Sequence, residues 1–253
     1  MIIDVPQINQ LPALRYLWKE AFGDTDDFLD SFQSTAFDPN RCRCVTLDKN
    51  TVAALYWFDC SLEGKPIAYL YAIATANAYR GRGICHALME NTHSHLRVLG
   101  YEGCVLVPSS KELFDFYGRL GYDISCHVSE FQCSASQESV AVRRVSKTEY
   151  AELRHSLLPL GGVVQENENI DFLQTMADLY AGDGFALAAA HRNGVLYGIE
   201  LLGDKDVAPA ILRALGCNKG RFRTVGNDKP FAMYRSLTDG KIAPPIYLGL
   251  AFD

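Results

Sequence analysis

The feature that most constrains this fold is a glycine-rich loop between an apolar strand and a helix. The run IAYLYAIAT at 67–75 predicts a buried strand, and a helix is expected over roughly 83–99. Between them lies Arg80-Gly81-Arg82-Gly83. Glycines let backbone N–H groups come close to a ligand, and the N-terminus of a helix favours an anion. This order of elements therefore predicts a site for a pyrophosphate group.

The loop does not fit the common nucleotide-binding patterns. It lacks the third glycine of Gly-x-Gly-x-x-Gly, and it lacks the Gly-Lys-Ser/Thr of a P-loop. On its glycines alone, a plain turn from a strand to a helix is an equally good interpretation. A second motif lies downstream, where Ser109-x-x-Glu112 is a capping box that opens the helix KELFDFYGRL. That helix is expected to stop at Gly121, and a strand follows at 122–132.

Together these two segments resemble the GNAT superfamily of N-acetyltransferases. The signatures of that superfamily are Arg/Gln-x-x-Gly-x-Gly/Ala and Phe-Tyr-x-x-x-Gly-Phe. The first matches at Arg80 and Gly83 and departs at Cys85, where the family has Gly or Ala. The second matches at three positions and has a tyrosine in place of the last phenylalanine: Phe116, Tyr117, Gly121 and then Tyr122. The resemblance covers roughly residues 8–132.

The resemblance implies that acetyl-CoA is the acyl-donor substrate, and no metal is expected. In the superfamily two strands, here 67–75 and 103–107, splay apart and the donor lies between them. Backbone groups of the first strand would hold the pantetheine and polarise the thioester carbonyl, and loop amides would hold the pyrophosphate. The implied donor-binding residues are Ile73, Ala74 and Thr75 in the strand and Arg80, Gly81, Arg82, Gly83, Ile84 and Cys85 in the loop.

The resemblance also implies direct attack by an amine, with Tyr117 as the general acid that protonates the departing CoA thiolate. A phenol has a pKa near about 10 and carries its proton at neutral pH. The alternative for Tyr117 is a core aromatic on an amphipathic helix. No carboxylate lies in the strand 67–75. The general base is therefore left open between Asp59, Glu63, water and the terminal carboxylate of Asp253.

Cysteines and histidines outside these motifs carry weaker expectations. A thiol at a helix N-terminus, such as that of Cys85, is expected to have a depressed pKa. His93 and His95, two residues apart on a helix, are expected to be solvated and not to bind a metal. The eight cysteines contain no Cys-x-x-Cys pair, which disfavours structural zinc and favours free thiols. Met1–Pro6 does not resemble a signal peptide and no run is long enough to span a membrane, so a cytoplasmic location is expected.

The expected fold class is α/β (α+β), with a mixed central sheet flanked by helices and a second, smaller domain. We expect a catalytic domain over 1–135, a linker over 134–140 and a second α+β domain over 140–253. Short identities suggest a degenerate repeat: Asp27-Phe28-Leu29 recurs 144 residues later as Asp171-Phe172-Leu173, and the same offset places the turn Lys49-Asn50 on Asn193-Gly194. The alternative is an unrelated domain. Strands near 221–225, 230–236 and 246–252 are expected to follow.

The second half contains no Arg-Gly-x-Gly loop, so its expected task is to complete the acceptor site. A formal net charge of −6 disfavours a nucleic-acid partner and weakly favours a cationic substrate. The leading hypothesis is acetylation of a primary amine, either of a small molecule or of an amino terminus. The alternatives are transfer of another acyl or aminoacyl group, and a non-catalytic acyl-CoA-binding or sensor protein. The sequence leaves the acceptor and the oligomeric state open.

Overall fold

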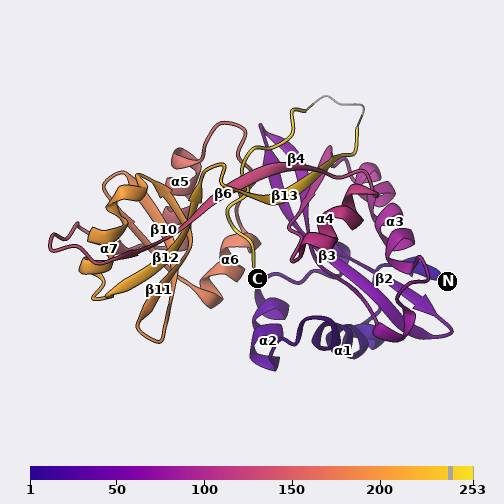
Figure 1. Ribbon diagram of the computed structural model, residues 1–253. Coiled ribbons are helices and arrows are strands. Elements are labelled where there is room, and N and C mark those ends of the chain that lie inside the picture. The colour runs from indigo at the N-terminus through magenta and orange to yellow at the C-terminus, as the bar shows by residue number, and fades with distance from the viewer. Residues whose placement is uncertain (239–241, 253) are drawn as a thin grey trace.

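The computed structural model describes residues 1–238 and 242–252 and has two lobes joined by one continuous sheet (Figure 1). The first half contributes the following elements in order: β1 (Ile2–Asp4), α1 (Leu11–Phe22), α2 (Asp26–Thr35), β2 (Cys42–Leu47), β3 (Asn50–Leu62), β4 (Lys65–Thr75), α3 (Ile84–Val98), β5 (Gly103–Leu106), α4 (Lys111–Gly118) and β6 (Asp123–Ser134). The mixed sheet with flanking helices confirms the expected fold class.

The second half follows with a similar set of elements. In order these are β7 (Arg143–Arg144), α5 (Lys147–Leu157), β8 (Val164–Gln165), α6 (Glu168–Met176), β9 (Asp178–Gly182), β10 (Phe185–Arg192), β11 (Val195–Gly203), α7 (Ala208–Ala214), β12 (Lys219–Val225) and β13 (Lys229–Ser236). Among the described residues, no helix is both long and apolar enough to cross a bilayer.

Alternation along β3 explains how helices cover both faces of the sheet in the first half. Successive strand side chains point to opposite faces. Tyr56 and Phe58 share a hydrophobic cluster with residues of α1 and α2 such as Trp18 and Phe32. Leu55 and Trp57 belong to a second cluster, which contains residues of α3 and α4. Helix α1 itself ends at Phe22, and Gly23 caps it with a φ of +75°, the left-handed conformation that favours glycine at this position.

A strand from the second half completes the sheet of the first. The strand order is β1-β2-β3-β4-β5-β13-β6-β12-β11-β10-β9-β7, so β13 lies between β5 and β6. Strand β6 pairs with β13 near its beginning and with β12 from Val128 to Ser134. Figure 1 shows β6 running from one lobe into the other. The division into 1–135 and 140–253 stays a prediction, and the two ranges share one sheet.

The order of elements in the first half recurs in the second. Each half has a short strand, two helices, three antiparallel strands, a helix and a strand that pairs in parallel with the third. Asp27-Phe28-Leu29 and its echo at 171–173 lie in the matching helices α2 and α6. The predicted turn at Asn193-Gly194 joins β10 to β11, so it matches the β3–β4 turn and not Lys49-Asn50. One offset fails because the connection after α6 is Ala177 alone, whereas six residues follow α2.

The expected strand at 246–252 is wrong. Over 242–252 the chain forms only an isolated bridge, in which the Val163 N–H donates to the Tyr247 carbonyl at 2.8 Å. The side chain of Gln165 takes the place of a neighbouring strand: its Nε2 donates to the Leu250 carbonyl at 2.8 Å, and its Oε1 accepts from the Leu250 N–H at 3.2 Å. Residue preferences within 246–252 cannot reveal that the backbone there bonds to the side chain of one distant residue.

A fully buried ion pair fixes this C-terminal segment between the lobes. Arg154 Nε donates to Glu200 Oε2 at 2.7 Å, and Tyr247 donates its hydroxyl proton to Glu200 Oε1 at 3.1 Å. Arg154 Nη2 also donates to Gln165 Oε1 at 3.2 Å. Because a buried charge must be paired and hydrogen-bonded, these groups hold α5, β11, β8 and the C-terminal segment in one arrangement.

Candidate active site

The strands β4 and β5 pair over only a short stretch and then separate. Their parallel register joins Ile67 to Gly103, Ala68 to Cys104 and Tyr69 to Val105. Beyond that point β4 continues to Thr75 without a strand on its β5 side. This is the gap that the resemblance implies between 67–75 and 103–107.

A bulge interrupts β4 where the gap opens. The β3–β4 register shifts between Ala54 and Tyr56, and Ala72 has a φ of +47°, a conformation that is strained for any residue with a Cβ. Of the predicted donor-binding residues in the strand, Ile73 is half-buried and directly follows the bulge. Ala74 and Thr75 pair with β3 on one side, and their other edge faces the gap.

The glycine loop joins β4 to α3 as expected. Gly81 and Gly83 have φ values of +74° and +75°, and Gly83 is the N-cap of α3. A Cβ built on either glycine would meet no atom within 4 Å, so the space beside the loop is open to a ligand. Both glycines are therefore required by backbone conformation and not by crowding.

Two arginines place positive charge at this loop. Arg80 and Arg82 are both exposed, and neither forms an ion pair with any described residue. Arg80 donates its Nε proton to the Thr75 carbonyl at 3.0 Å, and the Arg82 guanidinium lies 5.3 Å from the centre of the Tyr79 ring. The loop thus combines free cations, open backbone and a helix N-terminus, the combination that holds an anion.

Cys85 and Tyr117 meet on the face of the sheet that α3 and α4 cover. Burial raises the pKa of the Cys85 thiol to about 11, although the nearby Thr75 hydroxyl opposes that change. The expected depressed pKa is wrong, because the cost of burying a thiolate exceeds the effect of the helix N-terminus. Cys85 therefore stays a thiol, and Ile84 beside it is buried in the core.

Tyr117 lies on α4 and is buried, with 6% of its surface exposed. Burial, together with the neighbouring Cys85 thiol, raises the pKa of its phenol. The Tyr117 hydroxyl forms no hydrogen bond with the part of the chain that the structure describes. At neutral pH the Tyr117 hydroxyl therefore carries its proton, and no described protein group accepts a hydrogen bond from it.

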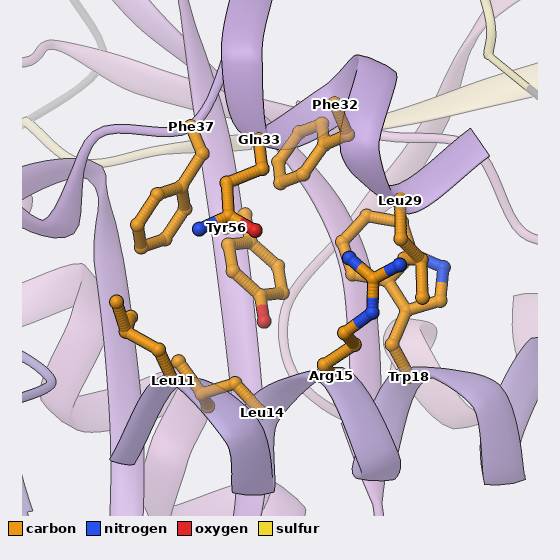
Figure 2. A pocket seen from close by; sticks show the side chains of 9 residues that line it. All are labelled: Leu11, Leu14, Arg15, Trp18, Leu29, Phe32, Gln33, Phe37 and Tyr56. Atoms are coloured by element: carbon orange, nitrogen blue, oxygen red, sulfur yellow. The ribbon is translucent and has the colours of Figure 1, made fainter. Parts of the chain in front are cut away.

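A small apolar pocket lies on the opposite face of the sheet, between α1, α2 and β3 (Figure 2). Figure 2 shows the Tyr56 hydroxyl pointing toward the space between Leu14 and Arg15. Arg15 at the rim pairs with Asp26 at 2.8 Å and with Asp30 at 2.7 Å. The remaining lining residues are Leu11, Trp18, Leu29, Phe32, Gln33 and Phe37. The Trp18 ring lies 5.6 Å from that of Tyr71, a residue that immediately precedes the bulge.

Comparison with known families identifies the first half of the chain. The acetyltransferase (GNAT) domain family matches residues 4–125. These residues are a GNAT domain. The match includes the glycine loop and Tyr117, and it ends within β6.

Solved structures share the fold over most of the chain. A GCN5-related N-acetyltransferase from Kribbella flavida superposes with a TM-score of 0.72 at 20% identity, covering 93% of this chain and 72% of that one. One from Anabaena variabilis gives 0.73 at 14% identity, covering 94% and 73%. Eis1 from Mycobacterium abscessus gives 0.70 at 11% identity, covering 94% and 74%. No curated protein matches the chain in sequence.

The candidate bases have different surroundings in the GNAT domain. Asp59 pairs with Arg41 at 3.2 Å and accepts a hydrogen bond from the Tyr101 hydroxyl. Glu63 occupies the β3–β4 turn, nine residues before the bulge at Ala72, which is about 30 Å along an extended strand. That distance places Glu63 away from the gap. Asp253 lies outside the described residues.

One buried polar cluster, around His93 on α3, was not predicted from sequence. His93 is fully buried, so its expected solvation is wrong: Nε2 lies 2.7 Å from the Tyr122 hydroxyl and Nδ1 lies 2.9 Å from Arg235 Nη1. Tyr122 also lies 3.1 Å from the Cys104 thiol. These partners explain why a tyrosine replaces the family's phenylalanine at 122. The spacing of Met89, His93 and Leu96 on one helical face could have indicated burial, whereas Arg235 lies in the distant strand β13.

Among the described residues, no cluster of three or more His, Cys, Asp or Glu side chains is placed to bind a metal. All eight cysteines belong to this part of the chain and are free thiols.

Proposed function

We propose that this chain is an N-acetyltransferase that transfers the acetyl group of acetyl-CoA to a primary amine of a small molecule or of an amino terminus. The observation that carries this proposal is the opening between β4 and β5, which leads directly to the glycine loop and the N-terminus of α3. Amides of the loop residues 80–85 would bind the pyrophosphate, with the two free arginines adding charge. The pantetheine would lie along the open edge of Ile73, Ala74 and Thr75.

In the proposed reaction the amine nitrogen attacks the thioester carbonyl carbon, and the carbonyl oxygen takes up the negative charge. The tetrahedral intermediate then collapses, and the bond from carbon to sulfur breaks. Tyr117 would donate its proton to the departing sulfur and later regain one from solvent. Its raised pKa keeps the phenol protonated before the step. A separate proton leaves the attacking nitrogen.

The acceptor of that second proton stays between the predicted alternatives. The Asp59 carboxylate is already engaged by Arg41 and by the Tyr101 hydroxyl, which leaves its oxygens less available to an incoming amine. Water could accept the proton without help from any protein group. The terminal carboxylate of Asp253 follows Phe252, whose carbonyl accepts a hydrogen bond from the Tyr71 hydroxyl at 2.6 Å.

Isothermal titration of acetyl-CoA and CoA against the purified protein tests the proposal. The native chain should bind both in the roughly 1 μM to 1 mM range that is usual for substrates. Gly83→Trp should weaken binding at least tenfold, because an indole would occupy the space of the pyrophosphate. Gly64→Trp is the matched control: Gly64 has a φ of +76°, the same open surroundings and a place in the distant β3–β4 turn.

Binding that is lost only in Gly83→Trp supports the loop as the donor site, and a screen of amines by release of free CoA thiol would follow. The absence of binding in the native chain, or equal losses in the two variants, would refute the proposal.

A further inference from the structure

A broad groove crosses the sheet of the second half, away from the glycine loop. One cavity of about 600 Å³ and a neighbouring one of about 580 Å³ share Gln132, Tyr197 and Arg221, so they form one continuous groove. Its floor is made of strands β6, β11 and β12. Met176, at the end of α6, lines one part of it, so the groove lies where helix coverage of this face ends.

Positive side chains outnumber negative ones in the described lining of this groove. Alternate residues of β12, namely Lys219, Arg221 and Arg223, point to the same face, and Arg192 of β10 adds a fourth cation. Among the described residues, one carboxylate lines the groove, that of Glu130. This local excess of positive charge contrasts with the formal net charge of −6 of the whole chain.

Most of these cations are not neutralised by the described residues. Arg192 and Lys219 form no ion pair there. Arg221 has a neutral partner, the side-chain amide of Gln132. When that amide is oriented to accept, its oxygen lies 2.8 Å from Arg221 Nη2 and 2.9 Å from Arg221 Nε. Only Arg223 faces a carboxylate, Glu130 at 3.4 Å, and Lys229 shares that carboxylate at 2.8 Å.

The C-terminal segment links this groove to the strand of the proposed acetyl-transfer site. Ala251 lines it, and the next residue, Phe252, accepts a hydrogen bond from Tyr71 on β4. Tyr71 immediately precedes the bulge at Ala72. Ala251, which lines the groove, is therefore one residue along the chain from a contact with the strand that borders the donor gap.

We propose that this groove binds an acidic polypeptide segment of the acceptor, whose amine reaches the gap beside β4. The inference rests on the proposed function only in calling the bound peptide an acceptor. The cations of β12 span about 13 Å from Lys219 to Arg223, the length of about four extended residues. Such a short strip suits a few carboxylates. A polynucleotide fits it less well, because Glu130 pairs with Arg223 at one end of the strip and the net charge repels a long polyanion.

Fluorescence anisotropy with a fluorescein-labelled peptide that contains four consecutive glutamates tests this inference without any acyl donor. The native chain should bind the peptide, with an affinity that falls as salt rises. The variant Arg192→Glu/Arg221→Glu should bind at least tenfold more weakly. The variant Lys205→Glu/Arg213→Glu makes the same change of charge at exposed residues on the α7 side of the sheet and should stay within twofold of native.

A second variant, Arg192→Ala/Lys219→Ala, removes two unpaired cations and serves if charge reversal impairs folding. It should weaken binding at least fivefold. No binding to the native chain, or equal losses in the groove and control variants, would overturn the inference. Tighter binding of a twelve-nucleotide polythymidine, lost in the same groove variants, would replace the peptide with a nucleic acid and overturn it too. Gly83→Trp should leave peptide binding unchanged, so failure here is distinguishable from failure of the donor site.

Discussion

Tyr117 and Tyr122 are five residues apart, yet their hydroxyls have different surroundings. The Tyr122 hydroxyl lies within hydrogen-bond reach of His93 and Cys104, and burial raises its pKa. The Tyr117 hydroxyl has no such partner within the described ranges. Two buried phenols in one motif can therefore differ in availability, and only Tyr117 has a proton that is free for a substrate.

Tyr117→Phe should reduce kcat by about 10²- to 10⁴-fold, the usual contribution of a general acid. The affinity for acetyl-CoA should not change, because the ring still fills its place in the core. Tyr122→Phe is the control: it should cost about 1–3 kcal/mol of stability through the polar partners it leaves, and kcat should remain. Steady-state kinetics and titration of the donor measure both effects.

Unchanged turnover in Tyr117→Phe would reduce Tyr117 to a packing residue. A native chain that binds acetyl-CoA but acetylates no amine in a broad screen would favour the alternative of an acyl-CoA-binding or sensor protein.

At the scale of elements, helix α3 is fixed to strand β13 by a buried histidine. Arg235 on β13 reaches Glu90 Oε1 at 2.6 Å and His93 Nδ1 at 2.9 Å, and it donates to the Leu120 carbonyl at 2.7 Å. Burial, and then the charge of Arg235, lowers the pKa of His93 from 6.5 to about 4. The contact between these elements therefore requires the neutral imidazole.

This contact predicts a loss of stability in acid. Between pH 6.5 and about 4 the unfolded chain binds a proton at His93 that the folded chain excludes, so stability falls as the pH falls through that window. The loss from this group should reach about 3 kcal/mol at pH 4. Urea unfolding at pH 7 and pH 4 measures how much free energy of unfolding each chain loses in acid. His93→Gln should lose about 3 kcal/mol less than the native chain. His86→Gln, at an exposed position of the same helix, should lose as much as native, and equal losses in both variants would contradict the prediction.

Local signals made most elements predictable from sequence. The helix after the glycine loop, the helix that begins near Lys111 and the hairpin at Asn193-Gly194 each depend on residues within a few positions of one another. The predicted capping box at 109–112 is wrong, because the N-cap of α4 is Ser110 and its side chain forms no capping hydrogen bond. The candidate donor site follows the same rule, because the loop residues 80–85 are consecutive in sequence and bind through backbone. What was not predictable depends on distant partners. Arg235 beside His93, and Gln165 in place of a strand for Leu250, each join segments more than 80 residues apart.

At the scale of the whole molecule, β13 makes the two halves depend on each other. It pairs with β5 over 233–236 and with β6 over 229–234, so without it both strands would expose an edge. Exposed edges promote association between chains. The family match covers one continuous stretch, residues 4–125. The sheet of that GNAT domain nevertheless needs β13, a strand from outside the stretch, to be complete.

The fragment 1–135 alone should fail to give a monomer with a cooperative thermal transition. Co-expression with 136–253 as a second chain should restore one soluble complex, because β13 can pair from a separate polypeptide. Size-exclusion chromatography and thermal unfolding followed by circular dichroism would check both outcomes. A stable, monomeric 1–135 would contradict this interdependence and support two separable domains.

The position of β13 also has a consequence for synthesis. The ribosome completes β6 at Ser134 and reaches the end of β13 at Ser236 only 102 residues later. At about 5–20 residues per second, the nascent chain waits roughly 5–20 s with both strand edges unpaired. During that interval a chaperone, or a neighbouring nascent chain on the same mRNA, can bind the unpaired strand edges. Correct assembly of this protein is therefore a matter of translation rate as well as of sequence.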